Sequence, residues 1–202
     1  MAISNGYCTL AELKAYENIS STNANDDTVL EDLVEHASRT IDNLCGRRFY
    51  SATETHYFTP DYIDLLFVDD LLSVTTLKAD EDGDGTYELT WATSDYSLEP
   101  RNALLSIPPA PYTMIRVKPN GLYSFPGVLN GIEIAGSWGY NTTSSHPDPI
   151  KTACLIIVSD AMLKREHKEQ ERGSLTSSGV VITAEGLPRR ALDLIRPYRR
   201  LV

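Results

Sequence analysis

The sequence contains no long run of apolar residues. Across its 202 residues, no stretch approaches the roughly 18 apolar residues that a membrane-spanning helix requires, so we expect no membrane contact. The N-terminus lacks a basic region followed by an apolar stretch, so a secretory signal peptide is not indicated. Hydrophobic residues still make up 42% of the chain, which suffices for the core of one domain, or of one domain that carries a large insertion.

Cysteine is scarce as well. The chain has only Cys8, Cys45 and Cys154, which are odd in number and widely spaced. A zinc site would need close cysteine pairs, and the sequence has none. We therefore expect reduced thiols in a cytosolic setting and no zinc site.

The motifs of the common enzyme classes are missing from the sequence. There is no HExxH, no G-x-S-x-G nucleophile elbow, no GxGxxG and no Walker loop. Asp69 and Asp70 are adjacent, so in a strand they would point to opposite faces and could not act as an acid/base pair. The histidines are isolated from one another and lack ligand spacing; they are His36, His56, His146 and His167. We expect no catalytic residues, no enzymatic activity and no cofactor.

Positive charge is in deficit, with 18 Lys and Arg against 28 Asp and Glu, a net charge of −10. Residues 151–202 hold 10 of the basic and 6 of the acidic side chains, a net of +4, which leaves −14 for residues 1–150. A body this acidic repels phosphate backbones, so tight DNA binding is not expected. The basic C-terminal part leaves open a local contact with an acidic partner or a nucleic acid.

A strongly periodic segment covers residues 26–46. Apolar residues recur at steps of three or four and would form one stripe of a helix: Leu30, Leu33, Val34, Ala37, Ile41 and Leu44. Asp26 and Asp27 can cap the first amides, and Gly46 can close the helix in a left-handed turn. The opposite face is charged, so this amphipathic helix needs a partner elsewhere in the chain.

Three further helices are expected. A short one begins at Thr9, where Thr9 and Glu12 have the spacing of a capping box. Another begins at residues 148–149, with Asp148 as cap, and is apolar on most sides, which indicates a central position. Its charged end at residues 164–172 should project into water, and residues 173–179 have the composition of a flexible loop. The last short helix begins at Pro188.

The middle of the chain has a different period. Short β-branched or aromatic segments lie near residues 53–58, 63–68, 73–79, 86–91, 114–118 and 130–137, separated by Pro, Gly, Asn and Asp. Tyr87, Leu89 and Trp91 alternate with polar residues, as in a strand with one buried face. This pattern predicts a mostly antiparallel β subdomain.

These elements together predict an α+β fold. Residues 1–49 and 148–202 would form a helical bundle, with residues 50–147 as an inserted β-rich subdomain. The helices would thus come from both ends of the chain and pack on each other.

One segment resembles the start of a calcium loop. Asp80, Asp82 and Asp84 with Gly85 match D-x-D-x-D-G, but the twelfth position is Trp91 where a bidentate Glu should stand, and the flanks are strands. The other interpretation is a tight hairpin turn. We therefore predict no metal site, while a calcium-binding β-module remains an alternative function. A small hydrolase with an unrecognised site is a third class, for which no residues can be named.

Arginine is concentrated near the C-terminus. This segment is either a solvated face or a docking surface, because arginine is favoured at interfaces and binds carboxylates in a bidentate manner. The candidate docking residues are Arg189, Arg190, Arg196, Tyr198, Arg199 and Arg200.

Several of these segments resemble the head–tail connector (adaptor, or head-completion) proteins of tailed bacteriophages and related prophages. The resemblance covers about the whole chain, and the family has no catalytic motif. The matching segments are residues 7–16, 26–49, 149–154 and 195–200, with 82–86, 95–96 and 138–140 in the β region.

The resemblance implies a structural virion protein that is assembled in the host cytoplasm and located in the neck of the particle. It implies a ring, commonly of twelve subunits, beneath the portal protein. Such a ring extends the DNA channel and docks a stopper or tail-completion protein. Double-stranded DNA would pass without tight binding, and we expect a neutral to negative lumen with the basic residues turned toward the portal.

Overall fold

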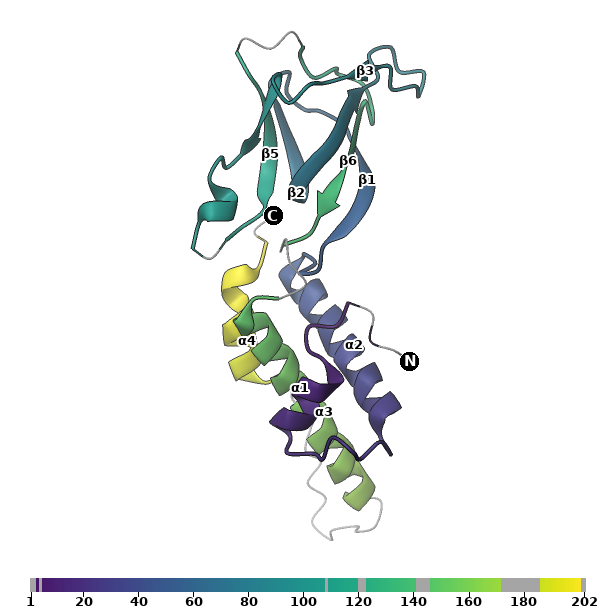
Figure 1. Cartoon of the computed structure of the whole chain (residues 1–202), viewed down its shortest axis with the longest axis vertical. Coiled ribbons are helices and arrows are strands. Elements are labelled where there is room, and N and C mark those ends of the chain that lie inside the picture. Colours follow the sequence, from purple (N-terminus) through teal and green to yellow (C-terminus); the bar gives the residue numbers. More distant parts are fainter. Residues whose placement is uncertain are drawn as a thin grey trace. The chain divides into compact units, whose positions relative to one another are not determined.

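The computed structural model describes residues 3, 5–107, 109–119, 123–140, 146–171 and 186–200, and only the backbone of 166–171. The chain divides into two compact units (Figure 1). The helical unit comprises Met1–Arg47 and His146–Val202, and the β unit comprises Arg48–Ser145. The predicted borders lie between residues 49 and 50 and between residues 147 and 148. The α+β fold with an inserted sheet is confirmed.

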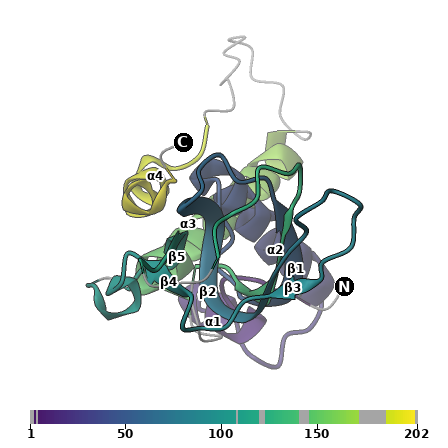
Figure 2. The same ribbon diagram turned by 90° about the horizontal axis from the view of Figure 1, so that it is seen from above.

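The helical unit is built from both ends of the chain. Its helices are α1 (Leu10–Tyr16), α2 (Asp27–Cys45), α3 (Asp148–Glu171) and α4 (Arg189–Ile195), and α4 continues into the 3₁₀ turn η2 (Arg196–Tyr198). Helix α3 packs against both α2 and α4. It lies between them in both views of the unit (Figures 1 and 2). The predicted central position of α3 is confirmed: Ile150, Ala153, Cys154 and Val158 are fully buried.

Helix α2 has the predicted stripe and the predicted C-terminus. Leu30, Val34, Ala37 and Ile41 are buried, and Gly46 adopts φ 64° with its amide donating to the Asp42 carbonyl. Only glycine reaches this left-handed conformation without strain.

The N-terminus of α2 differs from the prediction. The Asp26 side chain makes no capping hydrogen bond. The Asp27 carboxylate instead lies 2.5 Å from the buried Lys14 Nζ, which also donates to the Asn23 carbonyl at 2.7 Å. Asp27 pairs with the Lys14 ammonium and does not cap the helix, because a buried charge without a partner costs far more free energy than an uncapped helix end. The Asp26 side chain therefore caps none of the first amides of α2.

The other helices begin close to the predicted residues. The capping box at α1 is confirmed, with the Glu12 amide donating to Thr9 Oγ1 at 3.2 Å and the Thr9 amide to Glu12 Oε2 at 2.9 Å. Helix α3 begins at Asp148 itself, one residue before the predicted first position, and α4 follows Pro188 directly. The side chains of 166–171 and the predicted loop at 173–179 lie outside the described residues.

The β unit contains an antiparallel sheet. Its strands are β1 (Ala52–Phe58), β2 (Leu65–Ala79), β3 (Leu89–Thr90), β4 (Tyr96–Glu99), β5 (Tyr112–Val117) and β6 (Ile132–Trp138), with the 3₁₀ turn η1 (Ala103–Leu105). The order is β1-β6-β2-β5-β4, and β3 pairs with β2. The core includes Leu77, Ile115, Ile132, Ile134 and Trp138.

Three strand predictions need correction. The separate strands expected at 63–68 and 73–79 are one long strand, β2, whose register against β6 and β5 shifts at bulges around Leu71. The strand expected at 86–91 pairs only over Leu89–Thr90, although Trp91 is buried as the alternation predicted. Strand β4 was not expected. Among the described helices, none has the length and apolar character needed to cross a membrane.

Candidate docking surfaces and the acidic loop

The predicted arginine cluster separates into two groups. Arg189, Arg190 and Arg196 are exposed, and none of them makes an ion pair with another described residue. Ala191 and Ile195 form the buried side of the same helix, at 0% and 1% exposure. The short helix α4 thus fixes one face to the unit and presents a basic face to solvent.

The remaining members of the cluster anchor the chain end to α2. The Arg199 Nε donates to the Leu44 carbonyl at 3.0 Å, and the Arg200 amide donates to the Cys45 carbonyl at 2.8 Å. Tyr198 is buried, and burial raises the pKa of its hydroxyl. Arg199 and Arg200 thus bind the last carbonyls of α2, which is a structural role, and Tyr198 is part of the buried core.

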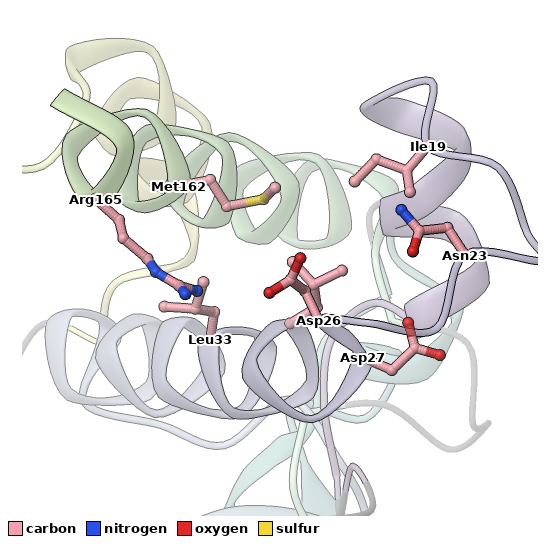
Figure 3. Close-up of a pocket in the computed structure, with 8 residues that line it drawn as sticks. Ile19, Asn23, Asp26, Asp27, Leu33, Met162 and Arg165 are labelled. Carbon is pink, nitrogen blue, oxygen red and sulfur yellow. The ribbon is translucent and has the colours of Figure 1, made fainter. Parts of the chain in front are cut away.

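A cavity lies at the opposite end of α2. It has a volume of about 300 Å³ and is lined by Ile19, Asn23, Asp26, Asp27, Leu30, Leu33, Met162 and Arg165. Asp26 and Leu33 from α2 face Met162 and Arg165 from α3 across it, and the α1–α2 loop closes one side (Figure 3). Apolar side chains form much of its wall. A volume of this size, at the lower limit for small-ligand pockets, admits a side chain of a partner.

The exposed face of α2, opposite its buried stripe, is acidic. Asp26 and Asp32 are exposed, and Glu31 and Glu35 are half-buried. Arg39 is the only basic residue within α2, and it pairs with Asp42 at 3.3 Å. The charged face was predictable from the sequence, but the cavity was not, because it depends on how α3 and the α1–α2 loop meet α2.

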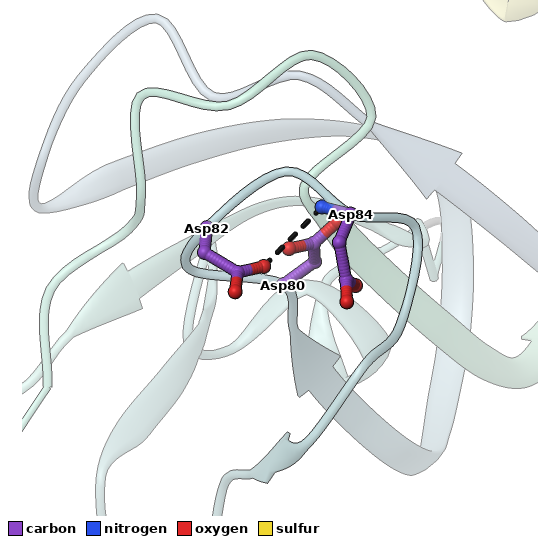
Figure 4. Close-up of side chains that lie close together, drawn as sticks. All are labelled: Asp80, Asp82 and Asp84. Carbon is purple, nitrogen blue, oxygen red and sulfur yellow. Dashed lines mark hydrogen bonds between the residues drawn. The ribbon is translucent and has the colours of Figure 1, made fainter.

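The acidic loop between β2 and β3 folds as a self-bonded turn. The buried Asp80 accepts hydrogen bonds from the Gly83 and Gly85 amides at 2.7 and 2.9 Å, and these bonds offset burial and lower its pKa. Asp82 accepts from the Asp84 amide at 3.2 Å (Figure 4). Gly83 and Gly85 have φ of 82° and 88°, as a tight turn requires.

The carboxylates of this loop still lie close together. One oxygen from each of Asp80, Asp82 and Asp84 falls within 4.8 Å of the others, the only such group among the described His, Cys, Asp and Glu side chains. Backbone amides already occupy both oxygens of Asp80, so the turn needs no ion to form. The absence of a metal site stays a prediction, with calcium binding as the alternative, and calorimetry with calcium decides between them.

The described histidines are dispersed. His36 is exposed on α2, and His146 contacts the Gly6 carbonyl at 3.1 Å. His56 on β1 stacks on Trp138 with ring centroids 4.1 Å apart, and its Nε2 lies 3.0 Å from Glu54. His167 lies outside the described side chains. That no enzyme is encoded remains an expectation.

Comparisons with known proteins show which folds this chain resembles. Neither a protein-family model nor a curated protein matches the sequence. Three solved structures contain chains of similar fold. The first is the neck of an empty gene transfer agent (GTA) particle computed with C6 symmetry, at a TM-score of 0.63 and 16% identity, covering 100% of this chain and 94% of that chain.

The second is the virion of a native GTA particle, at a TM-score of 0.61 and 18% identity, covering 100% of this chain and 94% of that chain. The third is the neck of a native GTA particle computed with C12 symmetry, at a TM-score of 0.60 and 16% identity, covering 100% and 93%. At these identities the likeness concerns the fold, and it agrees with the resemblance to head–tail connectors. This chain has, over its whole length, the fold of chains found in the necks and virion of GTA particles.

Proposed function

We propose that this chain is a structural protein of the neck in a phage or phage-like particle, where copies of it form a closed ring. The observation that carries the proposal is the likeness along 100% of the chain to chains in particle necks solved with C6 and C12 symmetry. A closed ring needs a subunit with complementary surfaces on two sides, and the helical unit has a basic face on α4 and an acidic face on α2.

More specifically, we propose the role of a head–tail connector below the portal. The ring would extend the DNA channel and offer a platform for a stopper or tail-completion protein. The role is non-enzymatic: the described residues include neither a nucleophile–base pair nor a cofactor cradle. Twelve subunits would match the symmetry of the neck in the third structure.

The charge balance supports a conduit rather than a DNA-binding protein. A net charge of −10 repels the phosphate backbone, so DNA can slide past such subunits without being held. Filter binding with the assembled ring tests this point. We expect weak, salt-sensitive retention of duplex DNA, and submicromolar affinity at physiological salt contradicts it.

Co-purification tests the connector role itself. The full chain, co-expressed with the portal protein of its own genome, should elute with the portal ring at a fixed stoichiometry. The charge-reversal variant Arg101→Glu, at an exposed β-unit residue, serves as a surface control that should elute likewise. A chain that never elutes with the portal ring contradicts the connector role.

A further inference from the structure

We propose that the basic face of α4 docks into the cavity at the N-terminal end of α2 in the next copy, so that adjacent subunits join head to tail. The docking face consists of Arg189, Leu192 and Arg196, called the α4 stripe below. The inference rests on the proposed ring and names the side chains of its lateral contact. It replaces the expectation that these arginines turn toward the portal.

The α4 stripe has the composition of an interface centre. Arg189 and Leu192 of α4 and Arg196, the first residue of η2, are spaced i, i+3 and i+7, so they lie along one side of the helix, next to the side that buries Ala191 and Ile195. Leu192, which stands between the two arginines along the helix, is 39% exposed. Asp193 shares this face, which leaves the stripe with a net positive charge. An apolar side chain flanked by arginines is suited to a partner that offers an apolar pocket with an acidic rim.

The cavity offers this complement. Its apolar wall is formed by Ile19, Leu30, Leu33 and Met162. Asp27 at its edge is held by Lys14, and Arg165 has its own interactions, but the Asp26 carboxylate caps nothing and lines the cavity. An arginine from outside can bind this carboxylate with paired, charge-assisted hydrogen bonds. Leu192 would then fill the apolar part, which is otherwise open to water.

The arrangement of the helices fits a ring. The stripe belongs to α4 and η2, whereas the cavity is lined by residues of α2, α3 and the segment between α1 and α2, so the two are different patches of the helical unit. A contact between two different patches is heterologous, and each copy that uses its stripe leaves its own cavity free for another copy. Repeating such a contact produces a ring when the rotation between neighbours closes, whereas one self-complementary patch would stop at a dimer.

Charge exchange tests the contact in the full-length protein. One variant carries Arg189→Glu with Arg196→Glu, and a second carries Asp26→Lys, at the carboxylate that lines the cavity. Each should self-associate about a hundredfold more weakly than the wild type in sedimentation velocity, because like charges then face each other. An equimolar mixture should associate again, since alternating copies place opposite charges at every contact. Arg101→Glu, the same reversal in the β unit, should change nothing.

Cysteine trapping provides a readout that does not depend on stable rings. Leu192→Cys mixed with Asn23→Cys, at the cavity rim, should give a disulfide-linked heterodimer at high protein concentration. Leu192→Cys mixed with Tyr62→Cys, which is exposed in the β unit, is the matched control. Circular dichroism shows which variants keep the wild-type fold. Where a Leu192 cysteine variant does not, Leu192→Asp tests the same contact, and it should self-associate more weakly than the wild type in sedimentation velocity.

The outcomes separate this inference from the proposed function. Rings that persist in both charge variants, or trapping no stronger than in the control, overturn the α4 contact and leave the ring intact. If the α4 charge variant loses portal binding but self-associates like the wild type, the α4 stripe binds the portal, and the proposed contact between copies is overturned. A wild-type chain that forms no ring alone, with the portal or in particles contradicts the proposed function itself.

Discussion

The thiol of Cys8 lies 3.6 Å from the thiol of Cys154, although 146 residues separate the two cysteines in the chain. Both side chains are buried, and Ser38 Oγ of α2 lies 3.6 Å from the same Cys154 sulfur. The segment before α1, the middle of α2 and the middle of α3 therefore share one core. The two ends of the polypeptide build the helical unit jointly, and the β unit is inserted between them.

Thiol reactivity should report the integrity of this unit. Burial raises the pKa of Cys45 to about 11, and the contact with the Cys154 thiol, together with burial, raises the pKa of Cys8. For Cys45 the thiolate fraction near neutral pH falls about a hundredfold on this account, and the sulfur is also shielded. We expect alkylation of Cys45 to require unfolding. Mass spectrometry of maleimide-treated protein with and without denaturant measures this, and rapid labelling of Cys45 in the native protein contradicts it.

Gly139 should be irreplaceable in the β unit. Its φ is 129°, and a Cβ there would lie 2.1 Å from the Tyr50 carbonyl oxygen. We expect Gly139→Ala to lower the free energy of unfolding by at least about 3 kcal/mol, because the added Cβ would clash with the Tyr50 carbonyl oxygen, a backbone atom that cannot move aside. Gly85→Ala is the control, because Gly85 has φ 88° but nothing within 4 Å. That control should cost only about 1–2 kcal/mol. Equal losses in urea unfolding argue against the clash.

The Arg48–Glu54 ion pair should make stability depend on acid pH. Arg48 Nη1 and Nη2 lie 2.9 and 2.6 Å from the two Glu54 oxygens, and this pairing, with His56, lowers the pKa of Glu54 from 4.5 to about 2. A lowered folded-state pKa adds stability above pH 4.5 that disappears as the pH falls toward 2.

We expect Glu54→Gln to remove this contribution at neutral pH. The loss should stay under about 1 kcal/mol, because the pair is partly exposed and screened by solvent. The unfolding curves of wild type and variant should converge in acid. Glu88→Gln, at an exposed carboxylate of the same unit, is the control. A gap between wild type and Glu54→Gln that is independent of pH contradicts the assignment.

The capping box of α1 should be worth about 1 kcal/mol, the usual loss when a side-chain cap is removed. Thr9→Ala removes the acceptor for the Glu12 amide and should lower stability by that amount. Thr40→Ala offers a comparison, since its hydroxyl donates only to the His36 carbonyl inside α2. We expect a change within about 0.5 kcal/mol there. Thermal unfolding of both variants decides, and equal effects would show that α1 does not depend on its cap.

The helices were predictable because their signals are local. The stripe from Leu30 to Ile41 and the left-handed Gly46 are fixed by spacing and by backbone conformation alone. The single strand β2 was not, because Asp69 and Asp70 resemble a break between two strands. In the sheet Asp69 is exposed while Asp70 is buried, and nearby bulges absorb the shift in register.

The candidate site was predictable only in part. The arginines were named from composition, but the sequence could not tell the exposed Arg189 and Arg196 from Arg199, which is bonded to the end of α2. Leu192 is an apolar residue of a helix that packs on the unit, yet it lies at the surface, which its residue type alone does not indicate. The cavity beside Asp26 requires three segments distant in sequence, so no local pattern could indicate it.

Electron cryomicroscopy of the particles that contain this chain tests the central claim most directly. We predict a closed ring of identical copies in the neck, between the portal and the tail, with the helical units of neighbours in contact. Copies that lie elsewhere in the particle, or that are present singly rather than as a ring, would contradict the account.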